Sequence, residues 1–152
     1  MSAMTLTQRR DGEPGASYLE LVELLQRQGA DTLGDTHQLF RRIVFSILIH
    51  NTDDHLRNHG FFIEDRGVRL SPAYDINPSV GRDDLTLAIN ETETACDVEI
   101  ARAAHKMYSL RLKDADGLIA EVVAAVKTWR DEADVLRIRR SEQDQMASAF
   151  AA

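Results

Sequence analysis

The sequence predicts a mainly α-helical domain with one small β-hairpin, an α+β fold. Apolar residues recur at helical spacing in the first and last thirds of the chain, and two short apolar runs flank a glycine-containing turn between them. The 152 residues are 43% hydrophobic and 28% charged, close to the averages for soluble proteins. Because a chain of this length can bury a core of its own, we expect residues 1–152 to form one domain.

The first part of the chain is expected to be a loop or arm followed by a helix. Residues 1–16 are polar and contain Gly12, Pro14 and Gly15, so they lack the means to build a core. Apolar residues at helical spacing begin after Ser17. Ser17 and Glu20 form a capping pattern, which places a helix between Ser17 and a stop at Gly29.

A second helix should begin at Asp35 and end near His50, deeply buried along one side. Beyond a polar segment, the runs 61–63 and 68–70 flank Glu64 to Gly67 and predict a short hairpin.

The rest of the chain is expected to be a loop followed by helices. Residues 74–81 contain Pro78 and Gly81 and read as a loop, and residues 85–89 as a short strand or extended segment. Helices are then expected from Asp97 to about Tyr108, from Asp114 through Trp129 to about Val135, and from Ser141 to Phe150. Their spacing makes Trp129, Val122, Val123 and Val126 core residues rather than a ligand cage.

Composition narrows the classes of function. The net charge is −7, and the only basic run is Arg137, Arg139 and Arg140, so we expect no nucleic acid partner. The longest apolar stretch, 43–49, is far short of a membrane span, and the N-terminus has no secretory pattern. Cys96 is the single cysteine, which fits a packing residue in a reducing compartment. We therefore expect a cytoplasmic protein.

One polar segment carries a catalytic pattern. In Asn-Thr-Asp-Asp-His-Leu-Arg-Asn, Asp53 and Asn58 are five positions apart, the spacing of the catalytic Asp and metal-binding Asn in protein-kinase loops. Such a pair arises easily by chance, so its surroundings decide its meaning. A buried helix precedes it, a hairpin follows, and Asp75 lies just beyond the hairpin, as in a kinase.

The chemistry of phosphoryl transfer explains why these residue types are needed. Mg²⁺ prefers oxygen ligands, so Asn58 and Asp75 are the candidates that hold the metal against nucleotide phosphates. An ionised carboxylate must orient the acceptor hydroxyl and accept its proton, and Asp53 is the candidate for that catalytic role.

Three stretches closely resemble the HipA family of serine/threonine kinases: Leu39-Phe40-Arg41-Arg42-Ile43-Val44-Phe45, then Asn51 through Phe61, then Leu70-Ser71-Pro72-Ala73-Tyr74-Asp75-Ile76. The resemblance implies a kinase-like C-lobe that uses ATP and Mg²⁺ and phosphorylates a protein substrate. It also implies a toxin-antitoxin system in which the partner is a HipB-like helix-turn-helix antitoxin.

The chain departs from the family pattern at its N-terminal side. No glycine-rich loop precedes Asp53, and the first lysine is Lys106, so the N-lobe is absent. We therefore expect the catalytic portion of a truncated or split kinase, inactive alone, whose N-terminal lobe is on a separate chain.

Two other functions remain open from the sequence. The chain could be a non-catalytic module that binds an antitoxin or a complete kinase. Alternatively, His50, His55 and His59 around Asp53 and Asp54 could hold the metal of a phosphohydrolase.

Three loop residues carry narrower expectations. Asp54 is expected to be an exposed loop carboxylate, and His55 to brace the loop by hydrogen bonds. Arg57 lies inside the loop, and the sequence leaves open whether it reaches phosphate groups.

Overall fold

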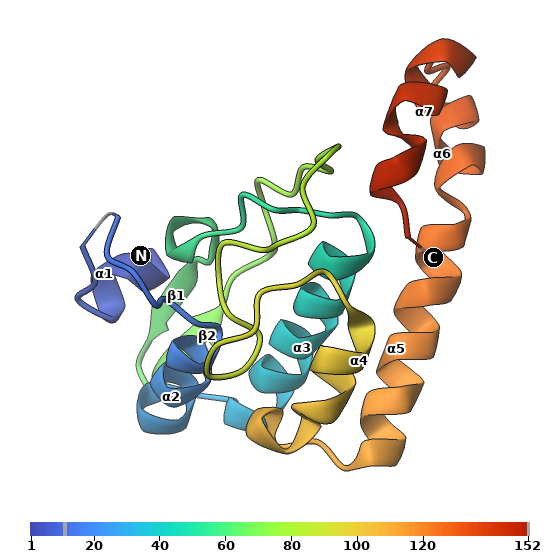
Figure 1. Cartoon of the computed structure of the whole chain (residues 1–152). Coiled ribbons are helices and arrows are strands. Elements are labelled where there is room, and N and C mark those ends of the chain that lie inside the picture. The colour runs from blue at the N-terminus through green and yellow to red at the C-terminus, as the bar shows by residue number, and fades with distance from the viewer. Residues whose placement is uncertain (11, 152) are drawn as a thin grey trace.

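The computed structural model describes residues 1–10 and 12–151 and has the predicted α+β fold (Figure 1). The helices are α1 (Ala3–Leu6), α2 (Leu19–Gln28), α3 (Thr32–Leu48), α4 (Val98–Ala103), α5 (Leu112–Lys127), α6 (Trp129–Val135) and α7 (Arg140–Met146). Short 3-10 turns are η1 (Leu56–Asn58), η2 (His105–Tyr108) and η3 (Ala147–Ala149). Strands β1 (Phe61–Glu64) and β2 (Gly67–Leu70) form the antiparallel hairpin, with Phe61 opposite Leu70.

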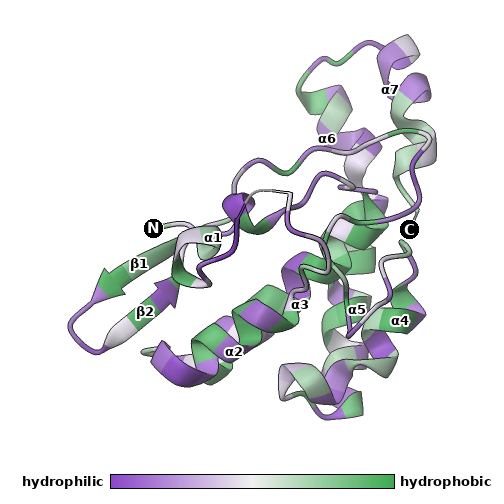
Figure 2. Ribbon diagram, turned by 60° about the vertical axis from the view of Figure 1, so that its left-hand side comes forward, coloured by the Kyte–Doolittle hydropathy of each residue, from purple (hydrophilic) through white to green (hydrophobic). Residues whose placement is uncertain are grey.

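Helix α3 is the centre of the domain. It packs against α2, α4, α5 and β2, so its apolar stripe faces neighbours on several sides. Figure 2 shows hydrophobic and hydrophilic residues alternating along α2 and α3, as amphipathic helices require. The hairpin lies at one side of the domain, whereas α6 and α7 project beyond the end of α5 (Figures 1 and 2). Within the described residues, none of the helices combines the length and apolar character needed to cross a bilayer.

The Ser17 and Glu20 side chains make local hydrogen bonds as the capping pattern predicted, but α2 begins at Leu19 and its N-cap position is Tyr18 rather than Ser17. The Leu19 amide donates to Ser17 Oγ at 3.1 Å, and the Ser17 amide donates to Glu20 Oε1 at 3.1 Å. The Ser17 hydroxyl also reaches the carbonyls of Ala88 and Asn90, both at 3.0 Å. These bonds therefore tie the start of α2 to residues 88–90.

The expectation of a plain loop or arm over residues 1–16 is wrong at its start. Ser2 caps α1, and Ala3 is fully buried. The Ala3 amide donates to the His59 carbonyl at 2.7 Å, and the Phe61 amide donates to the Met1 carbonyl at 2.8 Å. The open edge of β1 thus supplies hydrogen bonds that the composition of the segment does not reveal.

The expected start of the second helix at Asp35 is also wrong, because α3 begins at Thr32. The Asp31 side chain caps it, accepting from the Gly34 amide at 3.1 Å. Asp35 is buried instead, where it accepts from Arg69 Nε at 2.9 Å and from the Leu70 amide at 3.0 Å. The carboxylate that resembled a helix cap therefore fastens β2 to α3.

The C-terminal helices are shorter than predicted. Asp97 caps α4 as expected, but the helix gives way to η2 before Tyr108. Helix α5 begins at Leu112, ahead of Asp114, whose carboxylate pairs with Arg111 at 2.6 Å. A break at Thr128 separates α5 from α6. Residues 85–89 do not form the expected strand: the backbone bends at residues 86, 87 and 89, one isolated bridge joins Ala88 to Ser17, and Leu85, Leu87 and Ile89 are buried.

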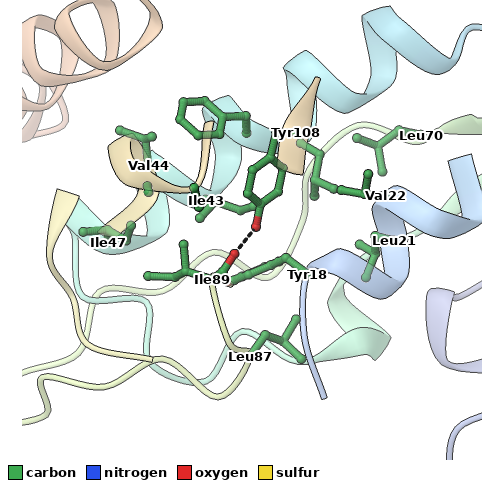
Figure 3. Packing of buried hydrophobic residues seen from close by; sticks show 14 of the residues in the cluster. Tyr18, Leu21, Val22, Ile43, Val44, Ile47, Leu70, Leu87, Ile89 and Tyr108 are labelled. Carbon is green, nitrogen blue, oxygen red and sulfur yellow. Dashed lines mark hydrogen bonds between the residues drawn. The ribbon is translucent and has the colours of Figure 1, made fainter. Parts of the chain in front are cut away.

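Two buried tyrosines unite the core (Figure 3). Tyr108 packs against Phe40 with ring centroids 5.3 Å apart, and its hydroxyl donates to the Ile89 carbonyl. Tyr18, the residue that precedes α2, lies in the same cluster beside Leu21 and Leu87. The core therefore joins residues 85–89 to the helices through a hydrogen bond as well as by apolar packing.

Replacing Tyr108 with Phe should lower the free energy of unfolding by about 1–2 kcal/mol, because the buried Ile89 carbonyl loses its donor. Urea denaturation followed by circular dichroism measures this. The matched control is Tyr74→Phe, whose residue is 46% exposed and whose hydroxyl donates to the Arg57 carbonyl at 2.7 Å. Equal destabilisation by both changes would contradict the assigned role of the buried bond.

Candidate functional site

The loop that contains Asp53 and Asn58 follows α3, which ends at Leu48. His50 adopts a left-handed backbone conformation with φ of 49°, and the Asn51 amide donates to the Ser46 carbonyl at 2.8 Å. The buried Asn51 side chain donates to Ser46 Oγ and accepts from the Asn77 amide, both at 3.3 Å. Asn51 therefore joins α3, the start of the loop and a later segment of the chain.

Asp54 anchors the middle of this loop in the interior. It is only 4% exposed, so the expectation of an exposed carboxylate is wrong. Its Oδ2 accepts from the Tyr18 hydroxyl at 2.7 Å and from Ser46 Oγ at 3.3 Å, and its Oδ1 lies 2.9 Å from His59 Nε2. A buried carboxylate is tolerated only with such partners, and here they come from three separate segments.

The electrostatics of this cluster favour an ionised Asp54. Burial opposes ionisation, but His59, Tyr18 and Ser46 stabilise the carboxylate more strongly, so the pKa of Asp54 lies below its ordinary value. Burial and the adjacent Asp54 charge raise the pKa of Tyr18 well above its ordinary value. Tyr18 is therefore a permanent donor at neutral pH and Asp54 a permanent acceptor.

Fixing Asp54 inward leaves its neighbour Asp53 exposed to solvent. Asn58, in η1, is buried, and its Nδ2 donates to the Asp53 carbonyl at 3.3 Å. This bond fixes the distance between the two residues along the loop. It also leaves the amide oxygen of Asn58 as the atom available to a metal ion.

Asp75 lies on a second segment, residues 71–79, which runs along the first. Three hydrogen bonds join the two segments: Tyr74 hydroxyl to Arg57 carbonyl at 2.7 Å, Asn77 amide to Asn51 Oδ1 at 3.3 Å, and Ser79 amide to His50 carbonyl at 3.0 Å. Asp75 falls between two of these attachment points, whose loop partners lie on either side of Asp53 in the sequence. The structure thus brings Asp53, Asn58 and Asp75 to one group of loops.

The backbone at Asp75 is strained. Its φ is 54°, a left-handed conformation that costs a residue other than glycine about 1–3 kcal/mol, although Asp tolerates it better than most. The exposed carboxylate accepts from Asn77 Nδ2 at 2.9 Å through Oδ1. Oδ2 of Asp75 is therefore the oxygen left for a ligand.

The histidines around the loop are not grouped as metal ligands among the described residues. His50 Nδ1 lies 2.9 Å from the Ala149 carbonyl, and His59 is held on Asp54. Nδ1 of His55 is buried and has no hydrogen-bond partner among the described residues, whereas Nε2 of His59 lies 2.9 Å from Asp54 Oδ1. Across residues 1–10 and 12–151, no three His, Cys, Asp or Glu side chains are grouped as metal ligands.

Other residues considered from the sequence have structural roles. Val122 and Val126 are buried as expected, and Trp129 stacks on Phe150 with centroids 4.2 Å apart. Burial, with nearby Asp83 and Asp84, raises the pKa of Cys96 to about 11, so its thiol is protonated and a poor nucleophile at neutral pH.

The structure is an α+β domain in which the loop that contains Asp53 and Asn58 lies beside the segment that carries Asp75, next to a hairpin. The chain belongs to the HipA-like C-terminal domain family, whose family model matches residues 1–130.

The curated relatives of this chain are much longer than the chain itself. "Putative kinase Y4mE" of Sinorhizobium fredii is 28% identical over 105 residues, 69% of this chain and 22% of the relative. A "Putative kinase" of Haemophilus influenzae is 32% identical over 66 residues, 43% of this chain and 19% of the relative. The chain therefore spans about a fifth of the length of these relatives.

A solved structure shares the fold. It is the HipA, HipB and operator DNA complex of the Shewanella oneidensis toxin-antitoxin system, with a TM-score of 0.72 and 18% identity over 95% of this chain and 35% of that one.

Replacing Asp54 with Asn should lower the free energy of unfolding at pH 7 by about 2–3 kcal/mol, because buried charge-assisted hydrogen bonds are lost. The folded-state pKa of Asp54 is depressed, so its stabilisation is present above the unfolded-state pKa of about 3.9 and is lost as the pH falls through the folded value. Denaturation of both proteins from pH 7 to pH 3 should therefore show their difference shrinking below about pH 4.

The matched control is Asp53→Asn, which changes an exposed carboxylate one residue away and should alter stability by less than about 0.5 kcal/mol. A constant difference between wild type and Asp54→Asn across this pH range would contradict an ionised, buried Asp54.

Proposed function

We propose that this chain is the catalytic and metal-binding portion of a HipA-like serine/threonine protein kinase, which transfers the ATP γ-phosphoryl group to a protein hydroxyl. One observation carries the proposal: Asp53, Asn58 and Asp75 lie on two segments that hydrogen bonds hold together. Family membership and the kinase names of the curated relatives support it.

Each of the three residues has a distinct role. Asp53, exposed beside the buried anchor, orients the acceptor hydroxyl and accepts its proton. The Asn58 amide oxygen and the Asp75 carboxylate are hard oxygen donors of the kind that Mg²⁺ takes, so they fit this ion. Bound Mg²⁺ would neutralise charge on the phosphate oxygens.

The rest of the nucleotide site must come from elsewhere. No glycine-rich loop precedes Asp53, and the first lysine is Lys106. We propose that an N-terminal kinase lobe, outside residues 1–152, grips the ATP phosphates from the opposite side. A HipB-like antitoxin is a further proposed partner, because the solved HipA structure of similar fold includes HipB. The lone, half-buried Cys96 fits the proposed cytoplasmic location.

Replacing Asp53 with Asn should reduce phosphotransfer by about 10²–10⁴-fold, because the hydroxyl-orienting carboxylate is removed with little change in shape. The assay uses γ-labelled ATP and the chain assembled with an N-terminal lobe supplied in trans. The control is Asp65→Asn at the exposed hairpin turn, which should keep full activity. Retained phosphotransfer by Asp53→Asn would show that Asp53 is not the catalytic base.

The chain alone, with ATP and Mg²⁺, should show little or no phosphotransfer, and adding the N-terminal lobe should raise it sharply. Residues that hold the ATP phosphates from one side only cannot align the acceptor hydroxyl with the γ-phosphate for transfer. Such alignment is equivalent to an effective molarity of about 10⁵–10⁸ M. Robust autophosphorylation by the isolated chain would contradict the proposal that this chain and an N-terminal lobe hold the ATP phosphates together. Absence of activity in every assembly would instead favour a non-catalytic module that binds an antitoxin or a complete kinase.

A further inference from the structure

A long groove lies beside the candidate site. It consists of two adjoining hollows, of about 250 and 420 Å³, which share Phe45 of α3 and Ala125 of α5 as lining residues. The first hollow begins at Arg41 and Arg42, and the second continues over Trp129 toward the tip between α6 and α7. The lining between these ends is mainly apolar, which suits the side chains of a bound polypeptide.

One wall of the groove is the segment that carries Asp75. Ala73 and Ile76 line the first hollow, and Pro78 lines the second. Asp75 and Asn77, which alternate with Ile76 and Pro78, line neither hollow and hydrogen-bond to each other at 2.9 Å. The same short segment therefore separates the groove from the proposed phosphoryl-transfer site.

The two ends of the groove differ in charge and exposure. At one end Arg41 pairs with Glu121 at 3.1 Å, whereas Arg42 has no carboxylate within 4.0 Å in the part of the chain that the structure describes. Arg42 donates to the Ser71 carbonyl, and burial lowers its pKa although the more distant charges of Asp35 and Asp54 act in the opposite direction. At the other end Leu136 is 71% exposed and Ile138 is 42% exposed.

A half-buried cation without a direct counter-ion gains from a nearby carboxylate, and exposed apolar residues gain from a cover. We propose that the groove docks a segment of the acceptor protein, with an acidic side chain at Arg42 and apolar side chains lying over Phe45 and Trp129. The assignment to the acceptor rests on the proposed kinase function. A docked acceptor segment would contact Ile76, the residue that follows Asp75 in the sequence.

Two neighbouring alanines allow a matched test. Ala125 and Ala124 are both exposed on α5, but only Ala125 lines the groove. Ala125→Trp should fill the junction of the two hollows, whereas Ala124→Trp adds the same side chain outside it. The probes are fluorescein-labelled peptides of about twelve residues that carry one Glu followed by spaced Leu and Phe, with a matched set in which Lys replaces Glu.

Fluorescence anisotropy with the whole chain, without ATP or Mg²⁺, should show binding of the Glu peptides. We expect about tenfold weaker binding for the Lys peptides and for the Ala125→Trp variant, and unchanged binding for Ala124→Trp. In the assembly with the N-terminal lobe, Ala125→Trp should raise the KM for an acceptor protein that contains the peptide, and Ala124→Trp should leave that KM unchanged.

Several results would overturn the proposal. They are no binding by either peptide set, equal binding of Glu and Lys peptides, or equal binding by the two tryptophan variants. Self-association of the wild type that only Ala125→Trp abolishes would make a second copy the occupant, and loss of peptide binding on adding the N-terminal lobe would make that lobe the occupant. An unchanged KM despite peptide binding would refute the acceptor assignment. Failure of the kinase proposal itself is separate, because the binding assay needs no phosphotransfer.

Discussion

The buried carboxylate of Asp54 is the interaction on which the candidate site depends. An ionised group that is 4% exposed must be compensated by its surroundings, and its partners are Tyr18 before α2, Ser46 in α3 and His59 before β1. None of these segments can shift without weakening a bond to a buried charge. The carboxylate therefore fixes the loop against three parts of the fold at once.

The exposed chemistry follows from that fixed point. With Asp54 directed inward, Asp53 is exposed beside it, and Asn58 closes the loop by bonding to the Asp53 carbonyl. Asn51 makes the second attachment, because its side chain receives the Asn77 amide and so holds the segment that carries Asp75. Asn58 thus has both a structural and a proposed metal-binding role, whereas Asp54 and Asn51 only hold the loops in place and Asp53 and Asp75 are proposed only to act on the substrate and nucleotide.

The sequence predicted the local features and missed the long-range ones. The Ser17–Glu20 hydrogen bond, the hairpin and the cap at Asp97 depend on residues a few positions apart, and all three are present, although the N-cap of α2 is Tyr18 rather than Ser17. The buried role of Asp54 depends on Tyr18, 36 residues away, which no local pattern reveals. The only sequence feature that could have indicated a buried carboxylate was the adjacency of Asp53 and Asp54, because neighbouring side chains in a loop tend to point in different directions. Helix α1 was missed because its partners lie on the edge of β1.

The central claim is that Asp53, Asn58 and Asp75 form one metal and nucleotide site. Nuclear magnetic resonance of the isotope-labelled chain, titrated with ATP and paramagnetic Mn²⁺ in place of Mg²⁺, tests it most directly. The account predicts that the amide signals of these three residues broaden first, while those of Asp65 and Arg66 at the hairpin turn stay sharp. Broadening centred on the exposed pair Asp83 and Asp84, with Asn58 and Asp75 unaffected, would contradict it.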